Sequence, residues 1–148
     1  MIEIKKAALT EDTVAQLIEL SVIWEKEDIS FGLRANEKDD LQEPCFVALD
    51  DNKVVGYCFG HFYEADKKTT YAEIGERCFS LDELYVHPKW RSQGIGKRLF
   101  KAIEDEVKGE CVCLNLATST KDYKRILRFY DEEANMVFHD AFFVKRFD

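Results

Sequence analysis

The sequence predicts a mixed α/β domain, in which a sheet of mixed strand direction carries helices on both faces. Its 148 residues, 46% of them hydrophobic, suffice for one buried core. Strand-like and helix-like periodicities follow one another along the chain, as a layered α/β or α+β fold requires. No internal repeat or low-complexity tract interrupts them. We therefore expect a single domain that spans residues 1–148.

The N-terminal third begins with a strand and a helix. Residues 2–6 alternate apolar and charged side chains, as in a short strand. Thr10 can cap a helix with an acidic first turn. The apolar residues that follow recur at helical spacing: Val14, Leu17, Ile18 and Leu20. A second amphipathic segment is predicted from about Glu27 into Leu33, with its boundary left open by Gly32.

Three strand-like runs form the middle of the chain. Residues 45–49 and 54–63 flank a polar turn at 50–53, which predicts a β-hairpin. A third run, residues 78–86, follows a polar loop and is rich in aromatic and branched side chains. Pro88 should end that strand, because proline cannot donate to a ladder.

The last third alternates helices and strands. A helix after Gly96 presents one apolar face and should end at Gly109. That face carries Leu99, Ile103 and Val107. Residues 112–116 predict another buried strand, and a further helical face follows. It carries Tyr123, Leu127, Tyr130 and Ala134. Phe138 and residues 141–147 are predicted to form closing strands whose aromatic side chains join the core.

Composition excludes several classes of protein. The 29 acidic and 21 basic residues give a net charge of −8, which argues against a general binder of nucleic acid or of anionic membranes. No apolar stretch approaches the roughly 18–20 residues that span a bilayer. Five cysteines without CxxC spacing or a secretory leader predict a reduced, cytoplasmic protein. Cys111 and Cys113 suit buried thiols on a strand better than zinc ligands, so no metal is expected.

One segment, residues 84–99, combines a buried strand, a turn, two glycines and a basic helix start. Glycines let a ligand approach the backbone, and the first N–H groups of a helix point outward unpaired. Together with the helix dipole, these groups can bind a phosphate. The stretch from Lys89 to Ile103 has no acidic residue and five basic ones: Lys89, Arg91, Lys97, Arg98 and Lys101. The sequence therefore predicts an anion-binding loop in an otherwise acidic protein.

Two nucleotide-binding motifs do not fit this segment. The dinucleotide fingerprint GxGxxG requires a third glycine where the chain has Leu99. The P-loop requires a glycine five residues before Gly96, where the chain has Arg91, and a Ser or Thr where it has Arg98. A glycine turn that leads into an ordinary surface helix is the plain alternative.

The segment resembles the GNAT superfamily of acetyl-CoA-dependent N-acetyltransferases. The signature Arg/Gln-x-x-Gly-x-Gly/Ala is present as Arg91-Ser92-Gln93-Gly94-Ile95-Gly96, after a Leu-Tyr-Val-x-Pro sequence. The resemblance implies a splayed, mostly antiparallel sheet flanked by helices, with acetyl-CoA as the co-substrate. It also implies that the pantetheine pairs with the backbone of Leu84, Tyr85 and Val86. The pyrophosphate is expected on the N–H groups of Arg91, Ser92, Gln93, Gly94, Ile95, Gly96 and Lys97.

A weaker second resemblance lies near Tyr130. The family's second motif, Asn-x-x-Ala-x-x-Leu-Tyr followed by Gly-Phe, is matched by Phe129-Tyr130 at its Leu-Tyr. Tyr123 stands in place of the Asn, Ile126 in place of the Ala, and residues 134–136 in place of the Gly-Phe. The resemblance implies that Tyr130 is the acid that protonates the departing thiolate. A core tyrosine is the alternative.

Acetyl transfer to an amine needs a base, because an alkylammonium group with a pKa of about 10.4 must first lose a proton. Asp82 and Glu83 directly precede the expected pantetheine strand, and alternation sends them to opposite faces unless a bulge intervenes. Either one is a candidate. The N–H of Val86 is expected to stabilise the oxyanion. His61 and His87 also titrate near neutral pH, and both are interpreted as structural.

The acceptor is predicted from charge. Between Glu11 and Glu43, ten acidic and three basic residues give a local charge of −7, in a region that borders the acceptor site in the family. A cationic amine would be attracted there, although a solvated helix face explains the pattern equally well. The leading hypothesis is therefore an N-acetyltransferase for a small cationic amine of the polyamine, aminoglycoside or amino-acid type.

Two further functions and one oligomeric state remain as alternatives. A protein lysine or N-terminal acetyltransferase would need an extended peptide groove. A non-catalytic acyl-CoA-binding module would explain the altered second motif. Homodimers are common in the family, so a homodimer is an alternative to a monomer.

Overall fold

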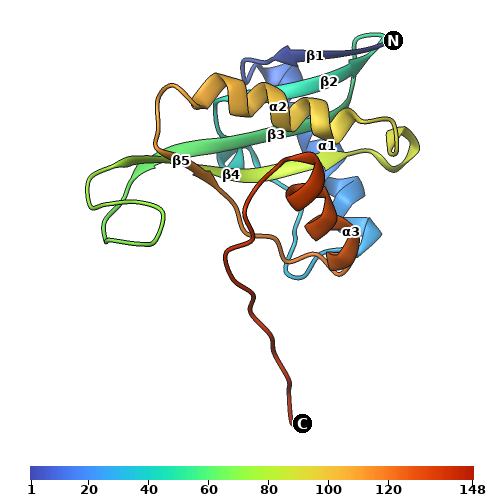
Figure 1. The fold of residues 1–148 in the computed structure, drawn as a ribbon. Coiled ribbons are helices and arrows are strands. Elements are labelled where there is room, and N and C mark those ends of the chain that lie inside the picture. The colour runs from blue at the N-terminus through green and yellow to red at the C-terminus, as the bar shows by residue number, and fades with distance from the viewer.

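The structure, a computed structural model, describes residues 1–148 and is built on a five-stranded sheet with the order β1-β2-β3-β4-β5 (Figure 1). The strands are β1 (Ile2–Lys6), β2 (Cys45–Asp50), β3 (Lys53–Glu64), β4 (Arg77–Val86) and β5 (Cys113–Asn115). The first four are antiparallel to their neighbours, and β5 runs parallel to β4. The expected mixed, mostly antiparallel sheet is confirmed.

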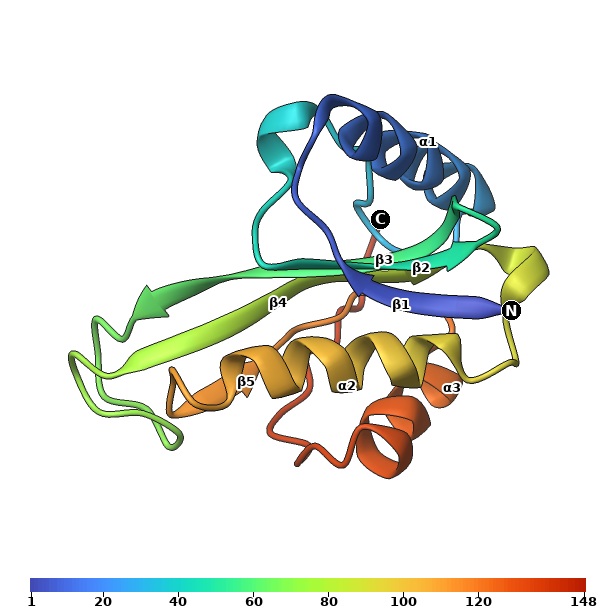
Figure 2. The same ribbon diagram turned by 90° about the horizontal axis from the view of Figure 1, so that it is seen from above.

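Helices cover both faces of the sheet. Figure 2 shows α1 (Glu11–Glu27) on one side, and α2 (Ile95–Val107) and α3 (Tyr123–Arg128) on the other. Each face has its own apolar core. Leu17 of α1 packs with Tyr57 and Phe59 of β3. On the opposite face, buried α2 side chains pack against residues of β2, β3 and β4: Ile95, Leu99, Phe100, Ile103 and Val107. This burial explains the strong apolar periodicity of α2.

Local interactions define both ends of helix α1. The Thr10 hydroxyl accepts the N–H of Thr13 at 3.3 Å, which caps the helix. Asp28 adopts a left-handed conformation with φ 53° and ends it. The predicted second amphipathic segment from Glu27 into Leu33 is wrong as a helix. Ser30 there pairs instead with Thr120, in an isolated antiparallel bridge.

The β2–β3 hairpin is confirmed. Its two central residues, Asp51 and Asn52, have φ values of 47° and 67°, the positive angles of a tight hairpin turn. Between β3 and β4 the register shifts after Phe59, because Phe59 pairs with Glu83 and Gly60 pairs with Leu81. Asp82 is therefore the extra residue of a β-bulge.

Gly60 is required at this bulge. A Cβ atom added there would lie 2.1 Å from the carbonyl oxygen of Ser80 and 2.7 Å from the ring of Phe79. No real Cβ contact is that short, so any side chain would force the two strands apart.

Strand β5 is shorter than the predicted 112–116, and it is paired with β4 over three residues only. The ladder joins Cys78 to Cys113, Phe79 to Leu114 and Ser80 to Asn115. Beyond Ser80 the two strands part, which leaves the C-terminal half of β4 without a neighbour on that side. Cys111 and Cys113 are half-buried rather than fully buried.

The predicted closing strands at Phe138 and 141–147 are wrong for this structure. After α3 the chain continues through a π-helical turn, Phe129–Glu133, and then runs without regular structure to residue 148. The apolar pattern is typical of a strand, but a strand also needs a neighbouring edge, and no strand of the chain pairs with this segment. None of the helices combines the length and apolarity that crossing a membrane demands.

Candidate active site

The loop between β4 and α2 presents a row of free backbone donors. The N–H groups from Ser92 to Lys97 have no hydrogen-bond partner within the protein. Ser92 and Gly94 adopt positive φ angles of 63° and 76°, which turn successive N–H groups outward. Gly94 precedes the first residue of α2, so the dipole of this 13-residue helix adds positive charge at the same place. This arrangement fits a pyrophosphate.

Most of the basic side chains predicted around this loop are engaged elsewhere. Arg98 donates to the carbonyl of Ile2 at 3.0 Å, and Lys101 pairs with Asp105 at 2.6 Å. Anion binding at the loop therefore depends chiefly on its backbone, with Lys97 at the first turn of α2.

Arg91 anchors the loop rather than presenting its charge to it. Its two terminal nitrogens donate to the carboxylate of Glu27 at 2.8 and 2.9 Å, and its Nε donates to the carbonyl of Val86 at 2.9 Å. The guanidinium also lies over the ring of Tyr85, 5.4 Å from its centroid, and Trp24 stacks on the same ring at 4.7 Å. The first residue of the signature thus connects α1, β4 and the loop.

The free edge of β4 lies beside this loop. His87 donates its N–H to Val55 of β3 at 2.9 Å, so the N–H of Val86 points the opposite way, to the side from which β5 has parted. The same alternation turns Leu84 outward and Tyr85 toward β3. An extended ligand can therefore add to β4 at Leu84 and at the N–H of Val86, as a strand would, while the carbonyl of Val86 accepts Nε of Arg91.

Glu83 is held by two side chains on the α1 face of the sheet. Its Oε1 accepts the hydroxyl of Tyr57 at 2.7 Å and the amide of Asn36 at 2.9 Å. Burial raises the pKa of the Glu83 carboxyl, while these two hydrogen bonds act in the opposite direction. A carboxylate with a raised pKa and a fixed orientation is suited to proton transfer.

The bulge places both candidate bases on this same face. The carboxylate of Asp82 lies 2.8 Å from Nδ1 of His61, and Ser80 Oγ donates to it at 3.4 Å. Asp82 is more exposed than Glu83, and its partner is an exposed histidine. Strict alternation, which would separate the two carboxylates, fails because of the extra residue.

Tyr130 lies on the other face of the sheet. It belongs to the π-helical turn and packs edge-on against Phe100 of α2, with 6.3 Å between the ring centroids. Burial raises the pKa of the Tyr130 hydroxyl to about 12, so it carries its proton at neutral pH. Phe129 beside it lies 3.6 Å from the position of a Cβ atom on Gly96. Glu83 and Tyr130 therefore lie on opposite sides of β4.

His87 lies just beyond β4. It accepts the N–H of Lys89 at 3.1 Å and packs edge-on against Trp90. Burial lowers its pKa. These contacts fit the structural role expected from the sequence.

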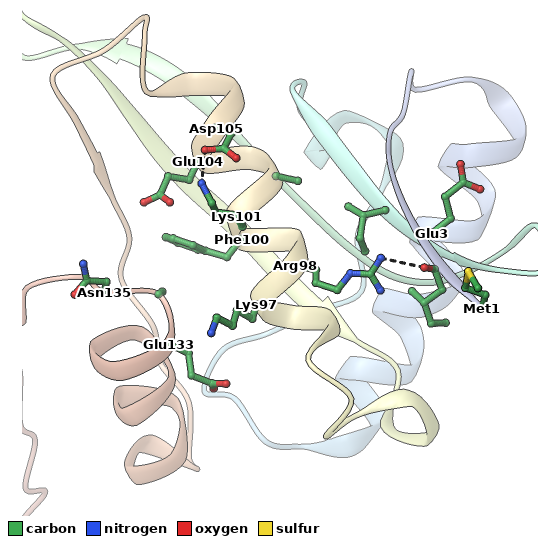
Figure 3. A pocket seen from close by; sticks show the side chains of 14 residues that line it. Met1, Glu3, Lys97, Arg98, Phe100, Lys101, Glu104, Asp105, Glu133 and Asn135 are labelled. Atoms are coloured by element: carbon green, nitrogen blue, oxygen red, sulfur yellow. Dashed lines mark hydrogen bonds and ion pairs between the residues drawn. The ribbon is translucent and has the colours of Figure 1, made fainter.

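A groove of about 1090 Å³ follows the outer side of α2, between β1 and the end of the π-helical turn. Figure 3 shows Lys97, Arg98 and Lys101 along it, together with the acidic Glu104 and Glu133. Because its lining mixes both signs of charge, the groove by itself selects neither anions nor cations. It reaches the loop at Lys97, so the loop lies at one end of an open surface.

Four residues of this site were missed by the sequence analysis: Trp24, Glu27, Asn36 and Tyr57. Each acts on a residue far away in the sequence; Asn36, for instance, is separated from Glu83 by 47 positions. Only the acidic character of the N-terminal third pointed toward Glu27. No local pattern marks an asparagine or a tyrosine as the partner of a distant carboxylate.

Comparison with known proteins gives a consistent result. The model of the acetyltransferase (GNAT) family matches residues 10–135, a range that includes the loop, Glu83 and Tyr130. No curated protein matches the sequence at a significant level.

Solved structures share the fold at low sequence identity. An aminoglycoside acetyltransferase from an uncultured soil metagenomic sample, in complex with trehalose, is 20% identical with a TM-score of 0.69, over 99% of this chain and 97% of that one. The aminoglycoside N-acetyltransferase AAC(6')-Iy in complex with CoA is 11% identical with a TM-score of 0.70, over 99% and 95%. A ribosomal-protein-alanine N-acetyltransferase from Brucella melitensis biovar Abortus 2308 is 19% identical with a TM-score of 0.66, over 99% and 100%.

Proposed function

Since the chain belongs to the GNAT acetyltransferase family, we propose that it transfers the acetyl group of acetyl-CoA to the primary amine of a small cationic acceptor. The arrangement that carries this proposal is the free edge of β4 between a proton acceptor and a proton donor. Glu83 lies on the α1 face and Tyr130 on the α2 face. When an amine and a thioester meet at this edge, Glu83 on one face of the sheet can accept the proton of the amine. Tyr130 on the other face can donate a proton to the sulfur.

The backbone supplies the binding of acetyl-CoA. The free N–H groups from Ser92 to Lys97 accommodate the pyrophosphate. Leu84 offers its outward N–H and C=O groups to the pantetheine, in the manner of an added strand, and the N–H of Val86 is left for the thioester oxygen. CoA in the complex of the AAC(6')-Iy enzyme supports this assignment.

Glu83 takes the proton of the acceptor ammonium, because its carboxylate is fixed by Tyr57 and Asn36. The neutral amine then forms a C–N bond with the thioester carbonyl carbon. The N–H of Val86 donates to the oxygen that becomes negative in this step. When the C–S bond breaks, Tyr130 gives its proton to the sulfur. The nitrogen loses its second proton to the Tyr130 phenolate, which restores Tyr130, and Glu83 returns its proton to solvent, so each acetyl transfer releases one proton.

The acceptor class follows from the charge on the α1 face. Glu83 and Asp82 lie close together there; the two hydrogen-bond partners of Glu83 are the uncharged Tyr57 and Asn36, and Asp82 contacts the exposed His61. Three other acidic residues of the N-terminal third are paired with basic side chains: Asp40 with Arg34, Glu27 with Arg91, and Asp28 with Lys121. We therefore attribute recognition of a cation to Glu83 and Asp82 rather than to the whole N-terminal third. Aminoglycoside acetyltransferases among the similar structures support a polycationic amine.

We place the enzyme in the cytoplasm, because all five cysteines are free thiols. Within the fold, burial raises the pKa of the Cys45 thiol to about 12, which keeps it protonated and unreactive.

A panel of amines tests the proposal. The protein is mixed with acetyl-CoA and polyamines, aminoglycosides or amino acids, and the acetylated product is detected by mass spectrometry. We expect acetylation of at least one polycationic amine, and its loss in Glu83→Gln. If no amine is acetylated while proteins in a cell extract are, the acceptor is a protein lysine or N-terminus. If neither is acetylated but CoA binds, the protein is an acyl-CoA-binding module.

A further inference from the structure

The interior of the chain holds very few polar side chains. Apart from tyrosines and cysteines, the polar residues buried in the fold are Ser21, which is 1% exposed, and Asn36, which is 8% exposed. A polar group taken out of water needs a hydrogen-bond partner, so the burial of each residue depends on its contacts. Both residues belong to one chain of hydrogen bonds, and that chain ends on Glu83.

Helix α1 holds the backbone of Asn36 in place. The hydroxyl of Ser21 donates to the carbonyl of Ile18 at 2.7 Å and accepts the N–H of Asn36 at 2.8 Å. The preceding N–H, that of Ala35, donates to the carboxylate of Glu25 at 2.9 Å. Side chains of α1 thus bind two consecutive N–H groups of the segment between α1 and β2, which fixes Asn36 relative to the helix.

The side chain of Asn36 reaches from there to Glu83 of β4. Its Nδ2 lies 2.9 Å from Oε1 of Glu83, and the hydroxyl of Tyr57 lies 2.7 Å from the same oxygen. An ionised carboxylate can only accept, so both partners act as donors. Oε2 of Glu83 has no hydrogen-bond partner in the protein, and since no buried side-chain oxygen lacks a partner, Oε2 is open to solvent. The two oxygens of Glu83 therefore have different surroundings.

We propose that Asn36 is a positioning residue for the acetyl transfer: held by Ser21, it fixes Glu83 through Oε1 and leaves Oε2 as the oxygen that takes the proton of the acceptor ammonium. The inference rests on the proposed function. In this step the N–H bond of the ammonium breaks, its electron pair stays on the nitrogen, and an O–H bond forms at Oε2. A carboxylate fixed at one oxygen presents the other in a single direction, which favours a productive approach of the amine.

Loss of the amide donor should change the acidity of Glu83 in a known direction. Burial raises the pKa of Glu83, and the hydrogen bonds from Tyr57 and Asn36 act in the opposite direction. Without Asn36 the pKa should therefore rise further. Four other charged or titratable residues face Glu83 or its neighbours: Arg34, Asp40, His61 and Asp82. All four stay in place in the variants below, so their effect cancels in the comparison.

The titration of Glu83 tests the contact without any acceptor. In protein labelled with carbon-13 at the glutamate carboxyl groups, the Glu83 signal is the one that is missing from Glu83→Gln. We expect its midpoint to rise by about one pH unit in Asn36→Ala. It should rise further in Asn36→Asp, which keeps the shape of the side chain but replaces the donor with a like charge.

Gln16→Ala is the matched control. Gln16 also connects α1 to the sheet through its amide, which accepts the N–H of Val54 at 3.0 Å, but it does not contact Glu83. This variant loses a comparable contact of α1, so it shows what a purely structural change does. Its Glu83 midpoint should equal that of the wild type.

Acetylation kinetics test the role of Asn36 in the reaction. In Asn36→Ala, the acid limb of kcat/KM should move to higher pH by the same amount as the titration. Above that limb, kcat should fall by about tenfold. KM for the acceptor should stay unchanged, because Asn36 acts through Glu83 rather than on the amine. In Gln16→Ala the acid limb should not move.

Three results would overturn the inference, and they can be told apart. If the wild type is active but neither Asn36 variant moves the titration of Glu83, Asn36 does not hold the carboxylate. If the titration moves while the acid limb does not, Asn36 holds Glu83 without positioning it for the reaction. If the wild type acetylates no amine, the proposed function fails, and this inference fails with it even where the titration moves.

Discussion

The Arg91–Glu27 pair gives the most informative prediction, because it distinguishes an anchoring arginine from a phosphate ligand. The guanidinium makes three hydrogen bonds, two to Glu27 and one to the carbonyl of Val86. The side chains are 28% and 16% exposed, so solvent screens the pair only partly. Hydrogen bonds to charged groups contribute about 1.5–3 kcal/mol each when buried. After discounting for the exposure, we expect Arg91→Ala to lower the free energy of unfolding by about 2–3 kcal/mol.

A second bidentate pair serves as a matched control. Arg34 donates to both oxygens of Asp40, but its side chain is 62% exposed. Double-mutant cycles, measured by urea unfolding, should give a coupling energy of about 1–2 kcal/mol for Arg91 with Glu27. The coupling of Arg34 with Asp40 should stay below about 0.5 kcal/mol, as for exposed pairs. Equal coupling energies for the two pairs would refute the claim that partial burial strengthens the Arg91–Glu27 pair.

The change in CoA affinity caused by Glu27→Gln distinguishes the two roles of Arg91. If Arg91 anchors the loop, Glu27→Gln loosens the loop and weakens CoA binding by about tenfold. If Arg91 is instead a phosphate ligand that Glu27 competes for, the same variant frees its charge and strengthens binding. Isothermal titration with CoA measures the change, and tighter binding in Glu27→Gln would refute the anchoring role.

Three further predictions concern the bulge, the acid and the core. Gly60→Ala should destabilise the protein by about 1–3 kcal/mol, since its Cβ would meet the carbonyl of Ser80 at 2.1 Å, whereas Gly109→Ala, which meets nothing within 4 Å, should not; chemical denaturation compares them. Tyr130→Phe should leave the CoA affinity unchanged and lower kcat by a factor of about 10², and a loss of CoA affinity instead would assign Tyr130 to binding. Leu17→Ala removes a fully buried side chain and should cost about 2–5 kcal/mol, measured by thermal unfolding.

The sequence predicted those parts of the fold whose local pattern and tertiary environment agree. Helix α2 is an example, because its apolar face, its glycine start and its end near Gly109 are all local features. The β2–β3 hairpin is another, since Asp51 and Asn52 tolerate the positive φ angles that the turn needs.

The wrong secondary-structure predictions fall where the conformation of a segment depends on pairing with a distant part of the chain. The segment from about Glu27 into Leu33 was predicted to be amphipathic, but the left-handed Asp28 ends α1 and Ser30 pairs with Thr120. Residues 137–148 have a strand pattern, but no strand of the chain pairs with them. Propensity alone specifies neither outcome.

In the candidate active site too, local features were predictable from the sequence, and features that depend on distant residues were not. The anion-binding loop follows from its own residues, and the structure leaves the N–H groups from Ser92 to Lys97 free as expected, whereas the N–H of Arg91 donates to the carbonyl of Pro88 at 3.4 Å. The choice between Asp82 and Glu83 could not be made, because the bulge that turns both to one face depends on a register shift opposite Gly60. The engagement of Arg91 by Glu27 was also hidden, since 64 positions separate the two residues.

The pH dependence of kcat/KM in Glu83→Gln tests the central claim most directly. Burial raises the pKa of Glu83. As the pH is lowered, Glu83 therefore becomes protonated at a higher pH than an ordinary carboxylate does. The wild-type rate should therefore fall on the acid side with a midpoint above the usual carboxyl range. Glu83→Gln, which can still accept the hydrogen bonds of Tyr57 and Asn36, should lose a factor of about 10²–10⁴ together with this dependence, whereas Asp82→Asn should keep it. An unchanged acid limb in Glu83→Gln, or its loss in Asp82→Asn instead, would contradict the assignment of Glu83 as the base.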